Sequence, residues 1–293
     1  MKKYLTIFIV LLIFFSSSIY SNTNNSLINE EESPAQFFIE YETGLVSVIN
    51  HKIQIGGNTN DLFNYVTQGG QDILFPFERF NVGAIINDRH RVSFLYQPLE
   101  INTVVPFEEK VIFDNKDFPA NSIVEIKYGF PFWRVSYSYD LLEEEELVLG
   151  IGASLQIRNA SIVFKEISDD VDNTQEVVVS QNVGPVPAFH IYSRWETPYN
   201  INLSADITGL YASSAFINGA DFEFEGSILD ASLRAGYQLK HNVEIFGNLR
   251  FLGGTAKGTS EYSDSNWSVA SSDPRYTENI LATFSATMGL TIR

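Results

Sequence analysis

The chain has 293 residues, a formal net charge of −17, 44% hydrophobic residues and no cysteine. The acidic balance argues against binding to nucleic acid or to anionic lipid headgroups, which both attract Lys and Arg. The absence of cysteine excludes disulfides, Cys-ligated metals, thiol catalysis and an acylated lipoprotein cysteine. The many Phe and Tyr residues, with 19 glycines, suit strands with aromatic girdles better than a helical core.

Residues 1–21 have the pattern of a secretory signal peptide. Lys2 and Lys3 precede an apolar run from residue 4 to 15, and a serine-rich segment with a cleavage point after Ser21 follows. The alternative is an uncleaved anchor, but the run is shorter than the roughly 20 residues that span a bilayer. Residues 22–35 are polar and are interpreted as a flexible periplasmic lead-in. We therefore predict export, with a membrane barrel over residues 36–293.

Amphipathic strands are predicted along the first half of this region, because apolar and polar residues alternate and a strand points successive side chains to opposite faces. These strands cover about residues 37–45, 79–86, 91–101 and 124–139. In the last two, the apolar set changes parity at Pro98 and at Pro131. We interpret each change as a β-bulge, where proline is tolerated, and chance in a noisy pattern is the alternative.

The clearest alternation runs from Leu147 to Phe164. Apolar residues at odd positions, such as Leu149 and Ile151, alternate with small or polar residues at even positions, such as Gly150 and Arg158, so the two sets would lie on opposite faces of a strand. The run exceeds the usual globular strand of roughly 5 to 6 residues and is long enough to cross a bilayer at a tilt. Further strands are predicted at about residues 188–195, 201–208, 229–239, 243–251 and 280–292.

The connections between these strands alternate in length. Short ones lie near 87–90, 141–146, 197–200 and 240–242, and long ones lie near 50–75, 105–121, 168–182, 214–221 and 260–276. Outer-membrane barrels have this asymmetry, with short periplasmic turns and longer outside loops. The predicted fold class is therefore all-β, a single closed antiparallel transmembrane β-barrel of about 10 strands. Eight or twelve strands are alternatives, because 105–121 could contain another hairpin, and a soluble β-sandwich is the competing fold.

The polar faces of the strands carry charged residues that the barrel would bring into its lumen. They are Arg91, Arg134, Arg158, Arg194, Arg234, Arg250, Lys127, Glu40, Glu42, Glu100, Glu125, Asp140, Asp206, Asp230 and Glu244. A barrel of about ten strands has a bore only slightly wider than one that side chains can fill. We predict a lumen filled by paired charges, since an unpaired confined charge is costly. A narrow small-solute channel is the alternative.

Histidine is the usual proton-transfer residue of enzymes, and only His190 lies inside a predicted strand. Ser193 is three residues away, so it faces the opposite side of a regular strand and cannot pair with His190. Ala188 stands where the Asp-x-His pair of the omptin proteases would need aspartate. We predict no enzymatic activity, no metal site and no cofactor, with His190 as a hydrogen-bonding residue of the lumen. An outer-membrane hydrolase of lipid or peptide that uses His190 is the alternative.

Three segments resemble an uncharacterised family of small Gram-negative outer-membrane β-barrel proteins. They are RVSFLYQPLE from Arg91 to Glu100, WRVSYSYDLL from Trp133 to Leu142 and LGIGASLQIRNASI from Leu149 to Ile162. The resemblance covers about the first half of the mature chain and implies an outer-membrane barrel without a known activity. The chain departs from such barrels at its end, where Arg293 stands instead of the aromatic residue that the assembly machinery reads.

These observations predict an envelope structural or interaction protein in the cell outer membrane, which makes its contacts through the outer loops. The expected partners are outer-membrane lipid, lipopolysaccharide and the barrel-assembly machinery, together with an extracellular or envelope protein of unknown identity. No nucleic acid is expected as a partner.

Overall fold

The computed structural model describes residues 35–54, 61–142, 144, 146–167, 176–213, 224–240, 242–259 and 276–293. Within these ranges, the side chains of 158–159, 179–185, 224, 240, 258–259 and 276–277 are not described. The chain divides into Met1–Pro34 and Ala35–Arg293. The predicted signal peptide and nearly all of the predicted lead-in lie outside the described residues. Among those that are described, no helix has the length and apolar character needed to cross a membrane.

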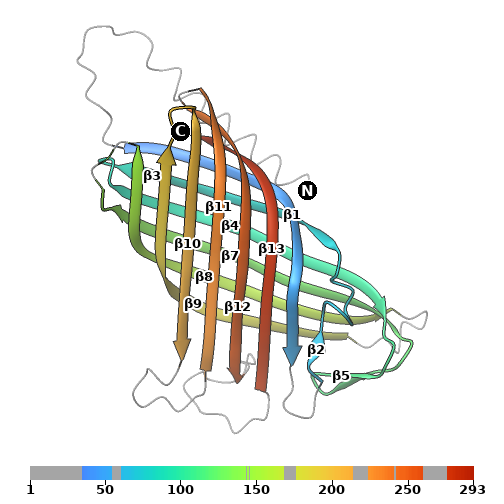
Figure 1. Ribbon diagram of the computed structural model, residues 1–293. Helices are drawn as coiled ribbons and strands as arrows, with labels where there is room; N and C mark the ends of the chain where they lie inside the picture. Colours follow the sequence, from blue (N-terminus) through green and yellow to red (C-terminus); the bar gives the residue numbers. More distant parts are fainter. Residues whose placement is uncertain are drawn as a thin grey trace, which may run out of the picture. The chain divides into compact units, whose positions relative to one another are not determined.

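Ten long strands form a closed antiparallel barrel, which confirms the predicted fold class (Figure 1). Each pairs with its neighbour in the chain, and the last pairs with the first, from Ile39 opposite Ile292 to Gln54 opposite Glu278. The strands are β1 (Ala35–Gln54), β3 (Leu74–Ile86), β4 (His90–Pro106), β7 (Ile123–Asp140), β8 (Leu147–Ile167), β9 (Glu176–Glu196), β10 (Ile201–Ser213), β11 (Phe224–Lys240), β12 (Val243–Thr259) and β13 (Tyr276–Ile292).

Three short strands lie within the predicted long connections. β2 (Phe63–Asn64) pairs with β1, so part of the expected loop at 50–75 joins the sheet. β5 (Val111–Phe113) and β6 (Lys116–Phe118) form a separate hairpin inside 105–121. All three elements lie at the end of the barrel that carries the long connections, at the bottom of Figure 1.

The tight turns use residues that tolerate a left-handed backbone. Asn87 and Asp88 have φ values of 50° and 56° in the turn between β3 and β4, and Asn200 has 58° between β9 and β10. Asn and Asp are the non-glycine residues that most readily adopt this conformation, and they do so here in the loops at 87–89 and 197–200. At the short turn between β7 and β8, Asp140 Oδ1 accepts hydrogen bonds from the backbone N–H groups of Leu142 and Leu149.

The predicted bulges at the two prolines are wrong. Pro98 lies opposite Pro131, in a register that runs without interruption from His90 opposite Tyr139 to Pro106 opposite Ile123. The same parity therefore faces the inside along the whole of β4 and β7, and only the chemistry of that face changes. Register shifts occur instead between Val48 and Asn50 of β1 and between Gln156 and Arg158 of β8.

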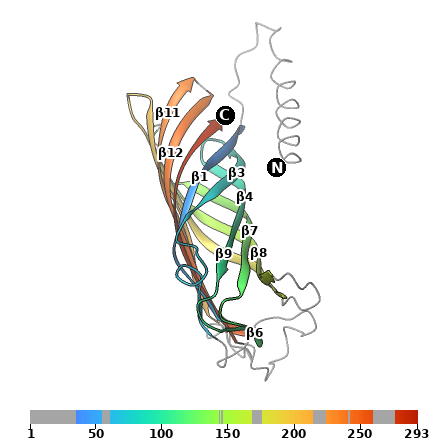
Figure 2. The same cartoon turned by 90° about the vertical axis from the view of Figure 1, so that its right-hand side faces the viewer.

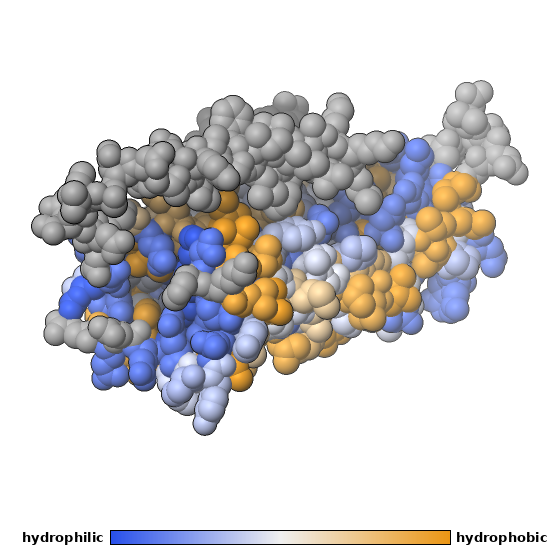
Figure 3. Space-filling model, turned by 90° about the horizontal axis from the view of Figure 1, so that it is seen from above, coloured by the Kyte–Doolittle hydropathy of each residue, from blue (hydrophilic) through white to orange (hydrophobic). Residues whose placement is uncertain are grey.

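The barrel consequently has two halves with opposite burial patterns. Next to the short turns, apolar residues face outward and polar ones face inward, and we call this the polar-core half. Next to the long connections, the buried inward residues are apolar, and we call this the apolar-core half. Its core includes Ile53, Phe63, Tyr65, Phe113, Phe118, Ile126, Tyr128, Ile162 and Phe164. Figure 2 shows β1, β3, β4, β7 and β8 crossing obliquely to β11 and β12. Figure 3 shows hydrophobic residues gathered on the outer wall between more hydrophilic groups.

Candidate functional site

The lumen of the polar-core half is filled by polar side chains from all ten long strands. Each of these side chains belongs to a residue that is at most 7% exposed. In strand order they are Glu42, Arg79, Gln97, Arg134, Gln156, His190, Thr208, Asp230, Arg250 and Ser285. A water-filled bore would leave such side chains accessible, so the lumen is packed at this level.

Asp230 lies at the centre of this layer and is fully buried. Its Oδ2 accepts hydrogen bonds from Arg79 Nη1 at 3.1 Å and Arg134 Nη1 at 2.7 Å, and its Oδ1 accepts one from Arg250 Nη1 at 2.8 Å. The three arginines come from β3, β7 and β12, so the cluster ties distant strands together across the lumen. Charge-assisted bonds of this kind are stronger than neutral ones, and they hold a charge that would be costly if unpaired.

Glu42 on β1 extends the cluster. Its Oε2 lies 3.4 Å from Arg250 Nη2, and its Oε1 accepts hydrogen bonds from Asn248 Nδ2 at 2.7 Å and from the Thr287 hydroxyl. Arg250 therefore bridges two carboxylates, those of Glu42 and Asp230. This pairing also couples β1, β12 and β13, the strands at which the barrel closes.

Five members of the layer are absent from the lumen residues predicted from the sequence: Arg79, Gln97, Gln156, Thr208 and Ser285. The first three contact its charged groups. Arg79 was on the predicted polar face of its strand but was not included in the charge network. Gln97 Oε1 accepts from Arg79 Nη1 at 3.1 Å, and Gln156 Oε1 accepts from Arg134 Nε and Nη2 at 3.0 and 2.7 Å. Strand alternation alone could have identified Arg79. The two glutamines carry no charge, and nothing in the sequence indicated that they accept hydrogen bonds from arginine.

Four more predicted residues pair nearer the short turns. Arg234 Nη1 lies 2.8 Å from Glu40 Oε1, and Glu244 Oε2 lies 3.1 Å from both Arg194 Nη2 and Arg293 Nη2. Arg293, unexpected as a final residue, thus joins the ion pairs of the lumen.

Two arginines of this region stack on aromatic rings, where the guanidinium is attracted to the π face. The Arg91 guanidinium carbon lies 4.1 Å from the centroid of Phe38 and 4.4 Å from that of Tyr192. That of Arg234 lies 3.7 Å from the centroid of Phe246. Phe246 in turn covers Gly289, where an added Cβ would lie only 2.2 Å from the Phe246 ring. Glycine is therefore required at 289 for this stack to form.

Three predicted lumen residues lie on the outer wall instead. Lys127 Nζ pairs with Glu100 Oε1 at 3.0 Å, with side chains 39% and 58% exposed, and Glu125 accepts from Asn102 Nδ2 at 3.2 Å. Their assignment to the lumen is wrong because it relied on the predicted bulges at Pro98 and Pro131, which the structure does not have. Without a bulge, these residues face away from the apolar interior of their half.

The other predicted residues have different positions. Asp140 is buried at a turn, where it accepts the backbone hydrogen bonds described above. Asp206 lies at the edge of the network, with its side chain 31% exposed and 3.9 Å from His190 Nε2. The side chain of Arg158 lies outside the described residues, so its pairing stays a prediction.

His190 has the surroundings of a structural residue. Its Nδ1 lies 3.1 Å from Thr208 Oγ1, which gives a hydroxyl, imidazole and carboxylate in sequence with Asp206. Thr208 is nevertheless fully buried, so a substrate has no access to the hydroxyl in this conformation. The Asp88-Arg89-His90 triplet has the Asp-x-His spacing, but it lies at the short-turn end of the barrel, where Asp88 and Arg89 are in the turn and His90 begins β4. In the part of the chain that the structure describes, no group of three His, Asp or Glu residues could hold a metal ion.

A second closure lies in the apolar-core half. We define the aromatic plug as Phe63, Tyr65, Phe107, Phe113 and Phe118, which come from β2, from the β5–β6 hairpin and from the segments beside them. Phe113 stacks on Phe164 of β8 with centroids 4.0 Å apart, and Phe63 meets the same ring edge-on at 5.0 Å. Rings in such geometry add to the free energy of apolar burial. The plug was not predicted from the sequence, because the segments that carry it have the composition of loops.

No family model matches the chain, and no curated protein matches its sequence. Solved structures are similar to it at low identity. The outer membrane protease OmpT from Escherichia coli has 11% identity and a TM-score of 0.47, over 89% of this chain and 97% of that one. A FadL homologue of Pseudomonas aeruginosa has 8% identity and a TM-score of 0.36, over 87% and 89%. Ail, the attachment invasion locus protein of Yersinia pestis, has 9% and 0.32, over 88% and 99%. The likeness concerns the fold of Gram-negative outer-membrane barrels, and the resemblance to one small family stays a prediction.

Proposed function

We propose that the protein is an integral barrel of the Gram-negative outer membrane with a closed lumen. In this role it is an envelope structural or interaction protein that makes contacts through its long-loop end. The observation that carries the proposal is the double closure of the lumen, by the buried polar layer around Asp230 and by the aromatic plug. Export through a cleaved signal peptide at residues 1–21 is part of the proposal.

The outer wall of the polar-core half supports the membrane location. Large apolar side chains such as Phe189, Leu233 and Met288 are among its most exposed residues. A surface of this kind marks contact with lipid or with another protein, and a closed barrel satisfies its backbone hydrogen bonds without water. Trp133 and Tyr96 stack with centroids 5.4 Å apart where the outer wall changes from apolar to polar. Aromatic residues favour this boundary between lipid and water.

Planar-bilayer recording on the refolded full chain tests the closed lumen. We expect no steady unitary conductance, because the polar layer leaves no water-filled bore. A porin refolded in the same lipid provides the positive control. A variant with Phe113→Ala and Phe118→Ala should also be silent, since it weakens the plug and leaves the polar layer intact. Steady unitary conductance of the unaltered protein would contradict the closed lumen and favour the narrow channel.

The interaction role rests on the outer wall of the apolar-core half. We call four polar residues on the outer wall of β4 and β7 the polar collar. They are Glu100, which pairs with Lys127, and Asn102, which donates a hydrogen bond to Glu125. We propose lipopolysaccharide as the lipid partner at this level and the barrel-assembly machinery as the partner of β13. Refolding into vesicles with and without lipopolysaccharide tests the first of these. We expect a higher thermal midpoint with lipopolysaccharide, and an identical midpoint in both would contradict that partner.

A further inference from the structure

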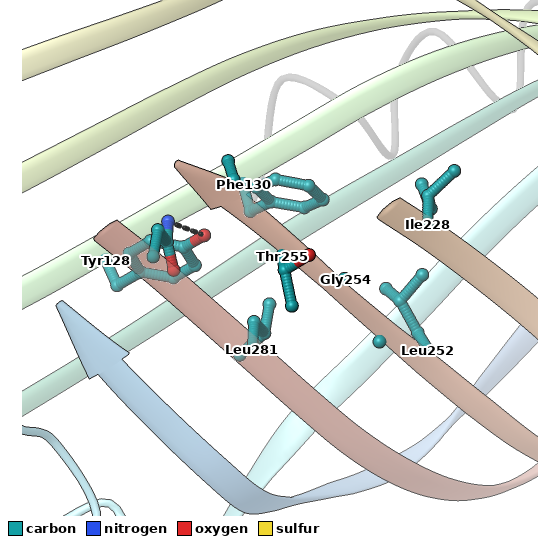
Figure 4. A pocket seen from close by; sticks show the side chains of 10 residues that line it. Tyr128, Phe130, Ile228, Leu252, Gly254, Thr255 and Leu281 are labelled. Atoms are coloured by element: carbon teal, nitrogen blue, oxygen red, sulfur yellow. Dashed lines mark hydrogen bonds between the residues drawn. The ribbon is translucent and has the colours of Figure 1, made fainter. Parts of the chain in front are cut away.

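A small cavity lies inside the apolar-core half, between β7 and the β11–β13 side of the wall (Figure 4). Its volume is about 30 Å³. Tyr128 and Phe130 border it from β7, and Leu252 and Leu281 border it from β12 and β13. The cavity exists because Gly254 and Ala256 follow Leu252 on the inner face of β12. Neither residue has a side chain long enough to fill the space.

One polar atom that lines the cavity has no hydrogen-bond partner among the described residues. Asn279 is 8% exposed, and its Nδ2 lies 3.5 Å from the Tyr128 hydroxyl, whereas its Oδ1 has no hydrogen bond. Buried side-chain oxygens are nearly always paired in native proteins, with protein or with ordered water. The described residues supply no donor to Oδ1, and a bound water is the simplest group that would do so.

More unpaired atoms gather around the same tyrosine. The His51 ring lies 4.4 Å from the Tyr128 ring and stacks on Tyr65 at 4.0 Å, with its Nδ1 2.7 Å from Gln71 Oε1. His51 Nε2, the Tyr65 hydroxyl and Gln71 Nε2 have no hydrogen-bond partner in the part of the chain that the structure describes, and all three residues are fully buried. This concentration of unpaired atoms sets the interface between the plug and the wall apart from the purely apolar packing around it.

The volume decides which ligand fits. A bound water needs roughly 10–15 Å³ of such space and two to four polar partners. About 30 Å³ therefore accepts one or two waters, and it is far too small for a sugar, an acyl chain or an aromatic molecule. We propose that this cavity is a specific water site in which Asn279 Oδ1 accepts a hydrogen bond from bound water. The Tyr128 hydroxyl, which also lines the cavity, supplies the second polar partner, whereas the Thr255 hydroxyl lies 2.9 Å from Ser227 Oγ on the outer face of β12.

A crystal structure of the refolded full chain at better than about 2 Å tests the site directly. We expect solvent density within hydrogen-bonding distance of Asn279 Oδ1. Asn279→Leu should lose that density and lower the thermal midpoint in detergent, because the bound water would lose its main anchor. The opposite result overturns the proposal. A dry cavity with a raised midpoint in Asn279→Leu would mean that the substitution only removes an unpaired acceptor.

The matched control is Leu281→Ile, which changes the same cavity without changing a polar group. We expect it to keep the solvent density. If Asn279→Leu does not refold, Tyr128→Phe serves as the second variant, since it removes one hydroxyl and retains the ring. Weakened density at Asn279 in Tyr128→Phe would support the water site, and unchanged density in this variant would overturn the role given to the hydroxyl.

Discussion

On strand β7, the inward residue Arg134 of the polar-core half binds Asp230, while the inward residue Tyr128 of the apolar-core half packs against His51. The outward neighbours of these two residues have the opposite chemistry: apolar Val135 is exposed in the polar-core half, and charged Lys127 is exposed in the apolar-core half. The strand keeps one register and one parity throughout. Along β4 and β7 the chemistry of the inner and outer faces is therefore exchanged between the two halves, and under the proposed function we expect lipid around the polar-core half and water around the apolar-core half.

The two halves are held together by different forces. Under the proposed function the apolar outer wall of the polar-core half contacts lipid, so the inside can be polar provided that its groups pair with one another. In the apolar-core half, burial of aromatic side chains inside supplies free energy of folding, and under the proposed function we expect water around its outer wall. Each half therefore has its own kind of sensitive residue.

Loss of the central carboxylate should have the largest effect. Asp230→Asn keeps the shape of the side chain but leaves Arg79, Arg134 and Arg250 without their shared charge. Removal of one partner from a buried ion pair costs about 3–5 kcal/mol, and here three arginines lose theirs. We expect loss of the heat-modifiable folded band. Asp206→Asn, at the edge of the same network, is the control and should refold. An unchanged urea midpoint for Asp230→Asn would show that the polar layer does not hold this half together.

The corresponding change in the other half is Phe164→Ala. Phe164 is fully buried and contacts Phe63, Phe113 and Tyr65. Large-to-small substitution of a buried Phe costs about 3–5 kcal/mol. The urea midpoint should fall, while bilayer recordings stay silent because the polar layer is intact. Phe284→Ala, on the outer wall, is the control and should have a smaller effect. Equal midpoints for the two variants would contradict the packing role of the plug.

A matched pair of lysine substitutions tests the change of surroundings directly. Val135 and Val104 are both on the outer wall and are 48% and 56% exposed, but they lie in different halves. Val135→Lys should cost about 2–4 kcal/mol, as for a lysine on the lipid face of a barrel. Val104→Lys should change stability by less than about 0.5 kcal/mol, as for an exposed surface substitution. Unfolding by urea in vesicles measures both. A large cost at Val104 would place lipid around the apolar-core half as well.

The smallest effect is expected on the polar collar. Glu100→Gln removes the exposed ion pair with Lys127, and such pairs contribute about 0–1 kcal/mol. The urea midpoint should be almost unchanged at moderate salt. A loss comparable to that of Asp230→Asn would mean that the collar is buried by a partner or by lipid headgroups.

Much of the barrel follows from alternation in the sequence. Leu147–Phe164 lies within β8 as predicted, and Glu40, Glu42, Arg134, Asp230 and Arg250 face the lumen as the polar sides of their strands indicated. Alternation specifies two faces, but it does not specify which of them is inside. The assumption that apolar residues always face outward led to the wrong prediction of bulges at Pro98 and Pro131. The same assumption wrongly assigned Glu100, Glu125 and Lys127 to the lumen.

The sequence by itself determined the closed antiparallel barrel, its short and long ends and the residues of most strand faces, because these depend on local periodicity and turn chemistry. Only the tertiary structure decided three further features: the sharing of Asp230 by three arginines, the entry of the β5–β6 hairpin into the lumen and the exchange of inside and outside along β4 and β7. The reason is physical. Contacts across the lumen join residues as far apart as Arg79 and Asp230, and their pairing depends on the barrel's closure rather than on any local pattern.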